Sequence, residues 1–241
     1  MKRLLTVLLI MAITMPMYGE NILSAIDKNN DAVSDIMMEV TMHTYNSNEL
    51  ISKKSLIMYQ KGAERRIVFF TEPPEDRGLG FLSLPGGEMY MYLPAYSTTK
   101  RIASHVKNNS FAGTDFAYED MESRKYEEWY DYAVLSETDS NYELELTVKE
   151  NKETDYEQII MTIDKAAMYP VKLKYYNAAG KHIKTMSSSN LSEKNGYVYA
   201  EKTTMTIPGS DNSSIMHIDR IEVNKGIGND FFSTRTLERG L

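Results

Sequence analysis

The chain of 241 residues contains no cysteine. It therefore has no disulfide bond, no thiol nucleophile and no cysteine metal ligand, and it cannot carry an acylated cysteine at a processed N-terminus. Burial of apolar side chains has to stabilise the fold without covalent help. Basic residues are outnumbered, since 27 lysines and arginines stand against 34 aspartates and glutamates. This acidic balance argues against a nucleic-acid partner, which requires a basic surface.

Long apolar runs are missing beyond the first 19 residues, which read MKRLLTVLLIMAITMPMYG. Two basic residues, a short apolar run and a terminal glycine are typical of a secretory signal peptide, so we predict cleavage after residue 19 and export to the periplasm. An uncleaved anchor is the alternative, although a membrane span takes about 20 apolar residues. Residues 20–241 carry a net charge of −9 and no Pro/Gly/Ser-rich linker, which predicts a single domain.

Catalytic and metal-binding motifs are also absent. The chain has no His-Glu-x-x-His, no Gly-x-Ser-x-Gly elbow and no phosphate-binding glycine loop. The stretch DKNNDAVSDIMM at 27–38 begins like a calcium loop but has Ala32 where glycine is needed and Met38 where glutamate is needed. We therefore predict no cofactor, no metal site and no enzymatic activity.

The segments that are present alternate apolar and polar residues with a period of two, which predicts β-strands. The clearest case is 142–148, where Tyr, Leu, Leu and Val alternate with Glu, Glu and Thr. Turn sequences separate neighbouring segments, so consecutive strands are expected to pair antiparallel. The expected strands are 36–45, 51–60, 64–71, 79–84, 88–93, 98–103, 142–148, 159–163, 171–175, 182–187, 196–207 and 214–224.

Three segments have a different pattern. Residues 20–35, part of 118–138 and the C-terminal tail have helical spacing, and Asn229 or Asp230 is the expected cap of the tail helix. Ten or so strands in one sheet must curl or close. The fold class is therefore mainly β (α+β), and the curved antiparallel sheet encloses either a filled core or an apolar cavity. The 16 methionines fit both, since methionine packs ordinary cores and also adaptable apolar surfaces.

The stretch SFAGTDFAYEDM at 110–121 has two interpretations. Asp115 and Glu119 are candidate carboxylates for acid–base hydrolysis. No His, Arg or Lys lies among them to adjust a pKa, so a structural corner explains the residues better. In that interpretation Gly113 adopts a backbone conformation closed to other residues, and Thr114 or Asp115 caps a following helix.

An ordered set of motifs in residues 69–121 resembles the LolA-like superfamily of bacterial outer-membrane lipoprotein-sorting proteins. Similar pieces recur near the C-terminus, so the resemblance covers about residues 20–240. The motifs are the Pro73-Pro74 turn, Gly80-Phe81-Leu82, Tyr92-Leu93-Pro94, Arg101-Ile102, the corner from Phe111 to Asp120, Tyr169-Pro170-Val171, Gly180-Lys181, Lys184-Thr185, and Phe232 with Leu237. The strand arginine that fastens the lid of the family's namesake carrier is not identified by these motifs, because Arg101 belongs to the Arg-Ile pair.

The resemblance implies a half-open barrel, in which helices cover the concave face of the sheet. It further implies a carrier that holds acyl chains of a lipid or lipoprotein between sheet and helices and exchanges them with a membrane exporter or an outer-membrane acceptor protein. The expected lining of the apolar groove is Phe70, Phe81, Leu82, Met89, Met91, Leu93, Phe111, Phe116, Trp129, Met161, Ile163 and Leu173. An alternative is a periplasmic sensor or adaptor that uses the same shape to bind an exporter or a regulator.

Overall fold

The computed structural model describes residues 21–122 and 124–241. The predicted signal peptide, residues 1–19, lies outside the described residues. Within the described part of the chain, no helix is long and apolar enough to cross a membrane.

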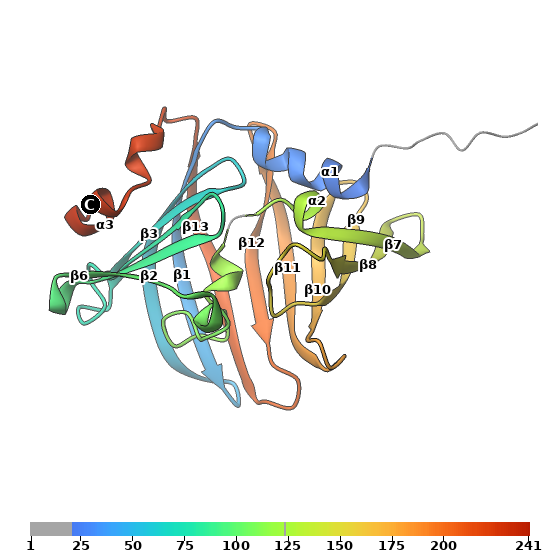
Figure 1. The fold of residues 1–241 in the computed structure, drawn as a ribbon, viewed down its shortest axis with the longest axis horizontal. Helices are drawn as coiled ribbons and strands as arrows, with labels where there is room; N and C mark the ends of the chain where they lie inside the picture. The colour runs from blue at the N-terminus through green and yellow to red at the C-terminus, as the bar shows by residue number, and fades with distance from the viewer. Residues whose placement is uncertain (1–20, 123) are drawn as a thin grey trace, which may run out of the picture.

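A single antiparallel sheet of 13 strands forms most of the molecule, in the order β6-β5-β4-β3-β2-β1-β13-β12-β11-β10-β9-β8-β7 (Figure 1). It is curved and open, with β6 and β7 at its two edges. The strands are β1 (Ile36–Asn46), β2 (Glu49–Lys61), β3 (Arg65–Glu72), β4 (Gly80–Leu84), β5 (Glu88–Leu93), β6 (Thr98–Arg101), β7 (Tyr130–Glu137), β8 (Asn141–Val148), β9 (Gln158–Asp164), β10 (Tyr169–Tyr176), β11 (His182–Lys194), β12 (Tyr197–Thr206) and β13 (Asn212–Val223).

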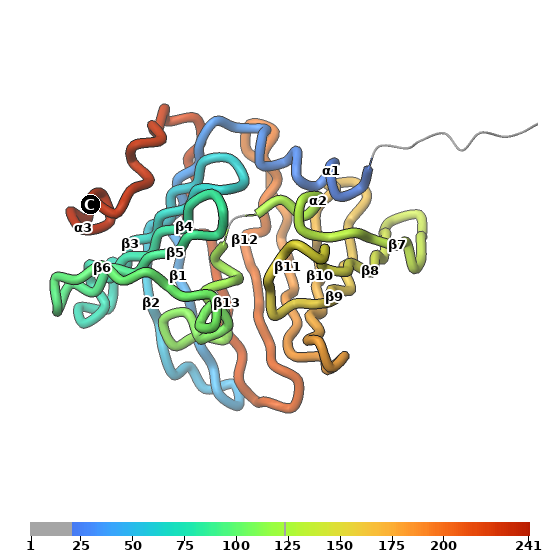
Figure 2. Tube along the Cα trace, in the orientation of Figure 1, coloured from blue at the N-terminus to red at the C-terminus, as the bar shows by residue number. Residues whose placement is uncertain are grey.

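The chain builds the sheet as two meanders. The strands from β1 to β6 are added outward in one direction, and those from β7 to β13 return from the opposite edge until β13 pairs with β1. Residues 102–129, here called the crossover segment, must therefore travel from one edge of the sheet to the other. Figure 2 shows that this segment passes over the concave face.

The helices are short. On the concave side lie α1 (Ile22–Asp27), which continues into η1 (Lys28–Asp31), and the crossover segment contributes η3 (Ser104–Val106), η4 (Glu119–Met121) and α2 (Tyr126–Trp129). The turn η2 (Pro94–Tyr96) joins β5 to β6, and the C-terminal η5 (Asn229–Phe231) and α3 (Thr234–Arg239) lie outside the β3–β6 end of the sheet (Figure 1).

The period of two assigns side chains to opposite faces. Val68 and Phe70 of β3 join a cluster on the concave face, whereas Ile67 and Phe69 pack on the convex face against Phe232 and Leu237 of the tail. A third cluster lies on the concave side of β8–β11, under Leu23 and Ile26 of α1. The predicted fold class is confirmed: a curved, open antiparallel sheet with helices on its concave face.

Two local predictions were wrong. The helical spacing within 118–138 predicts a helix that continues past Trp129, but α2 ends at Trp129 and residues 130–137 form β7. The tail helix is capped by the hydroxyl of Ser233, which accepts from the Thr236 N–H, because Asn229 and Asp230 belong to the preceding turn η5.

Candidate functional site

The crossover segment folds into a tight corner at its centre. Phe111 N–H donates to Phe116 O at 2.7 Å, and Gly113 has a φ of +78°, a conformation that side chains disfavour. Thr114 Oγ1 donates to Phe111 O, and the Asp115 carboxylate accepts from Ser214 Oγ of β13 at 2.7 Å. The predicted corner is present, but the predicted cap is wrong: these side chains tie the corner together and cap no helix.

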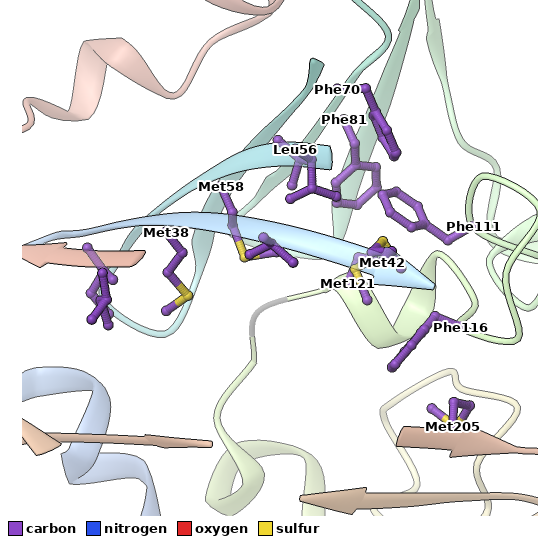
Figure 3. Close-up of a cluster of buried hydrophobic side chains, with 14 of the residues drawn as sticks. Met38, Met42, Leu56, Met58, Phe70, Phe81, Phe111, Phe116, Met121 and Met205 are labelled. Atoms are coloured by element: carbon purple, nitrogen blue, oxygen red, sulfur yellow. The ribbon is translucent and has the colours of Figure 1, made fainter. Parts of the chain in front are cut away.

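The corner drives two phenyl rings into the concave face (Figure 3). Phe111 is fully buried, with its ring centroid 5.6 Å from that of Phe70 and 5.5 Å from that of Phe81. Phe116 and Met121 enter the same cluster from the crossover segment. The cluster is rich in methionine, with buried or partly buried members Met38, Met42, Met58, Met89, Met121, Met186, Met205 and Met216.

A partly buried arginine fastens the crossover segment to the sheet. Arg66 of β3 donates from Nη1 to the carbonyl oxygen of Met121 at 3.0 Å and from Nη2 to Oε1 of Gln60 at 2.7 Å. Desolvation by burial lowers the pKa of the Arg66 guanidinium from its ordinary value. A guanidinium is suited to this position because its planar fork donates to two acceptors at once.

A second anchor is a buried ion pair between Asp120 of the crossover segment and Lys184 of β11, whose side chains are 3% and 7% exposed. Asp120 also accepts from Tyr156 Oη at 2.8 Å and from the Ala117 N–H at 2.7 Å. Burial, followed by the nearby Asp120 carboxylate, raises the pKa of the Tyr156 phenol well above its usual range. Tyr156 therefore stays neutral and donates.

A third anchor is a small ionic network at the end of the crossover segment. Arg124 donates to Glu119 at 2.9 Å and to Glu122 at 2.8 Å, and Lys107 is paired with Glu122 at 3.5 Å. The guanidinium carbon of Arg124 lies 4.2 Å from the centroid of the Trp129 ring. Glu119 also accepts from Thr154 Oγ1 in the loop after β8, so this network joins the segment to the β7 end of the sheet.

Two cavities flank these anchors. One, of about 900 Å³, lies between the β4–β5 turn, the crossover segment and the loop after β8, and it contains Arg124, Trp129 and Lys152. The other, of about 460 Å³, is lined by Asp115, Phe116 and Lys184 among others. Charged and amide groups dominate the lining of the larger cavity, whereas the smaller one also has apolar walls from Phe116, Ile183 and Ile207. The apolar cluster between them is packed with side chains.

The carboxylates that suggested hydrolysis do not share one site. Asp115 lines the smaller cavity and Glu119 the larger one, and each is engaged by the structural contacts described above. Among residues 21–122 and 124–241, no group of three His, Asp or Glu side chains is arranged to hold a metal ion.

Comparison with known proteins identifies a family and a fold for this chain. A family model described as "-like: Uncharacterized protein" matches residues 62–239. The fold matches a DUF1329 family protein from Desulfovibrio piger, with a TM-score of 0.82, 22% identity, and 89% and 96% of the two chains covered. The chain belongs to the matched family and has the LolA-like fold.

Two further solved structures have names that agree with the resemblance found in the sequence motifs. A protein described as an outer membrane lipoprotein-sorting protein domain, from Vibrio parahaemolyticus, matches with a TM-score of 0.78, 23% identity, and 90% and 98% coverage. A LolA superfamily protein from Nitrosomonas europaea matches with a TM-score of 0.74, 20% identity, and 89% and 97% coverage. The resemblance stated from the motifs is thereby confirmed at the level of the fold. No curated protein matches the chain.

Within the LolA-like fold, the twelve predicted groove residues fall into separate environments. Phe70, Phe81, Met89, Phe111 and Phe116 form part of the methionine-rich cluster, and Met91 accepts from Tyr118 Oη beside it. Met161, Ile163, Leu173 and Trp129 belong to the cluster under α1. Leu93 is half-buried at the end of β5. Leu82 lies on the convex face against Leu237, because it is adjacent to the inward Phe81 in a strand.

Sequence reasoning missed Arg66, Asp120, Tyr156 and Lys184 as functional candidates. Arg66 could have been identified, because in an expected strand it lies on the same face as the apolar Val68 and Phe70. Asp120 and Lys184 both occur in the motifs of the resemblance, but only the fold brings them together.

Proposed function

We propose that the protein is an exported, non-enzymatic carrier that binds an acyl chain of a lipid or lipoprotein on its concave face. In this proposal it works in the periplasm, where the crossover segment acts as a displaceable cover. The bound chain takes the position that the side chains of the corner occupy in the unloaded protein.

The observation that carries the proposal is the nature of this cover. The cluster on the sheet is broad and rich in methionine, a flexible side chain suited to variable apolar partners. The crossover segment covers it mainly with Phe111, Phe116 and Met121, through turns and single helical turns. A cover of this kind separates from the sheet at less cost than a long packed helix or a strand.

Approximate energies favour exchange of the cover for an acyl chain. A chain of about 16 carbons gains roughly 12 kcal/mol when its methylenes leave water, at about 0.8 kcal/mol each. Re-exposing three large apolar side chains costs roughly 5 to 9 kcal/mol. The difference remains to break the contacts of Arg66 and of the two ionic anchors, so these contacts would set the affinity.

Lipid extraction tests the proposal directly. The full chain, exported by a bacterial host, is purified and extracted with organic solvent, and the extract is analysed by mass spectrometry. Acyl lipids at near-stoichiometric amounts are expected. A fluorescent fatty acid should also bind the delipidated protein, with emission typical of an apolar site. Absence of both signals contradicts the proposal.

A reversible crosslink tests the cover itself. The chain has no cysteine, so the double variant Asp115→Cys/Ser214→Cys introduces one removable bridge between the corner and β13, at side chains now 2.7 Å apart. The oxidised variant should lose binding of the fluorescent fatty acid, and reduction should restore it. Equal binding in both states would show that the cover does not move. The same variant under reducing conditions is the matched control.

A second candidate function is a sensor or adaptor that binds another protein, such as an exporter or a regulator. The dense packing of the concave cluster favours it, because Phe81, Phe111 and Met89 have no exposed surface. The crosslinked variant separates the two candidates. An adaptor would keep its partner affinity in the oxidised state, whereas a carrier would lose its cargo.

A further inference from the structure

The two edges of the sheet are protected to different degrees. Edge strand β6 has only four residues, two of them Lys100 and Arg101. It is also tied to the C-terminal helix α3, because Thr99 Oγ1 donates to Glu238 at 2.7 Å. Short length, positive charge and a covering element are the usual devices that stop an edge from pairing with another chain.

Edge strand β7 has eight residues, and its part from Ala133 to Glu137 is exposed. Val134 and Leu135 are 49% and 51% exposed, which is unusual for large apolar residues on an edge. Within the described residues, the sheet ends at β7, and no strand pairs with its outer side.

The backbone register shows which groups of β7 are free. Lys149 N–H donates to Trp129 O, and the register continues through Asp131 opposite Thr147. In an antiparallel pair, hydrogen-bonded residues alternate with residues whose N–H and C=O point away. The backbone groups of Tyr132 and Val134 therefore point outward from β8. A register shift between Val134 and Ser136 ends this regular stretch.

The concave face of this edge is apolar. Tyr132 is paired with Leu146 and Val134 with Leu144, and both leucines are completely buried. The side chains of Tyr132 and Val134 therefore extend the apolar floor of the concave face to its rim. A strand added here would place every second side chain against them.

The convex face of the same edge is acidic. Asp131 is 80% exposed, Ala133 is paired with Glu145, and Ser136 with Glu143. The surrounding sequence is also acidic, because residues 130–165 contain ten acidic residues and three lysines, and two of these lysines, Lys149 and Lys165, pair with Asp131 and Glu137. A strand added to β7 would place its other side chains within reach of this acidic surface.

We infer that β7 is a docking edge for an extended segment of a partner polypeptide that alternates apolar and basic residues. The segment becomes the next strand of the sheet and is hydrogen-bonded to Tyr132 and Val134. Its apolar side chains lie on the concave face, and its basic side chains lie on the acidic convex face. A second copy of this chain is a poorer occupant, because two acidic β7 edges would repel. The inference does not depend on whether the protein carries an acyl chain.

Synthetic peptides test the edge. A fluorescent peptide of about nine residues that alternates lysine and valine is titrated into the purified full chain at low ionic strength. The matched peptides replace lysine by glutamate, or carry a central proline that cannot extend the ladder. Binding of the lysine peptide alone is expected. Amide hydrogen exchange should slow at Tyr132 and Val134, and it should not change at Asp131 and Ala133, which already bond to β8.

Variants of the protein distinguish strand addition from simple charge attraction. Val134→Pro removes an outward N–H and should weaken binding about tenfold, whereas Val134→Thr keeps the N–H and the branched shape and should weaken binding clearly less. Asp131→Lys/Glu143→Lys should reverse the preference toward the glutamate peptide. No binding at up to about 1 mM peptide, or equal binding by Val134→Pro, overturns the inference. A dimer in sedimentation that Val134→Pro dissociates would also overturn it, in favour of a second copy.

Discussion

The side chain of Arg66 on β3 reaches the carbonyl oxygen of Met121, 55 residues later in the chain, at 3.0 Å. This bond fixes the crossover segment on the concave face at the point where it leaves the methionine-rich cluster. Arg101, by contrast, has an exposed guanidinium that is paired with Glu88 at the β6 edge.

Replacement of Arg66 by lysine should loosen the crossover segment. A lysine cannot donate to Met121 O and Gln60 Oε1 in the same fork, so one buried acceptor loses its partner, at a cost of about 1 to 3 kcal/mol. Urea unfolding should show this loss, and amide exchange should quicken in residues 115–122. Arg65→Lys is the matched control, since Arg65 is the neighbour of Arg66 in β3 and its side chain lies on the opposite face of the sheet. Equal losses in the two variants would contradict the anchoring role.

The buried pair of Asp120 and Lys184 should be strongly coupled. Lys184→Met leaves a buried carboxylate without its cation and should cost about 3 to 5 kcal/mol, as should Asp120→Asn. The double variant should cost clearly less than the sum of the two, because neither charge is left alone. Urea unfolding of all four proteins measures the coupling. Lys165→Met, in the exposed pair with Glu137, should cost under about 1 kcal/mol. Additive losses at Asp120 and Lys184 would argue against the pair.

The strands could be predicted because one face of each is buried. In 142–148 the alternation of Leu144 and Leu146 with Glu143 and Glu145 matches the observed faces of β8. Strand β7 could not be found in this way, since at an edge its exposed residues include the apolar Val134 and Leu135, and the preceding aromatic residues have helical spacing. A polar–apolar pattern is informative only where one side is solvent and the other is core.

The site was less predictable than the sheet. Period two says that Phe81 and Leu82 lie on opposite faces, but it does not say which face is concave. That choice depends on the direction of curvature and on where the tail with Leu237 packs. The anchors Arg66 and Lys184 depend on the route of the crossover segment, which local sequence does not specify. The corner at Gly113 was predictable, because its backbone conformation is a local property.

The close contact between Gly80 and Leu237 should leave no room for a side chain at position 80. A Cβ added at Gly80 would come within 2.6 Å of Leu237 Cδ1, so Gly80→Ala should displace α3 from β4 and cost about 1 to 3 kcal/mol. Leu237→Ala removes a buried side chain and should cost about 2 to 5 kcal/mol. In the double variant the added methyl group has room, so its cost should be well below the sum. Thermal or urea unfolding measures this cycle, and strict additivity would exclude the steric explanation.

The pH dependence of stability should include a contribution from Asp35. Its buried carboxylate accepts from the N–H groups of Lys225, Gly226 and Ile227 and from the Ser34 hydroxyl. Burial alone would raise the pKa of Asp35, but these bonds outweigh it and lower the pKa below 3.8. The folded state therefore binds this proton more weakly than the unfolded state does. The contribution is fully present above the unfolded pKa and is lost as the pH falls through the folded pKa.

Asp35→Asn should therefore be less stable than the wild type near neutral pH, and the difference should shrink as the pH falls below about 4. Urea unfolding midpoints between about pH 7 and pH 3 provide the measurement. Asp31→Asn is the matched control, because Asp31 is exposed at the end of η1 and the substitution should change stability little. A difference between Asp35→Asn and the wild type that stays constant with pH would mean that the Asp35 side chain contributes through its shape and hydrogen bonds, without its charge.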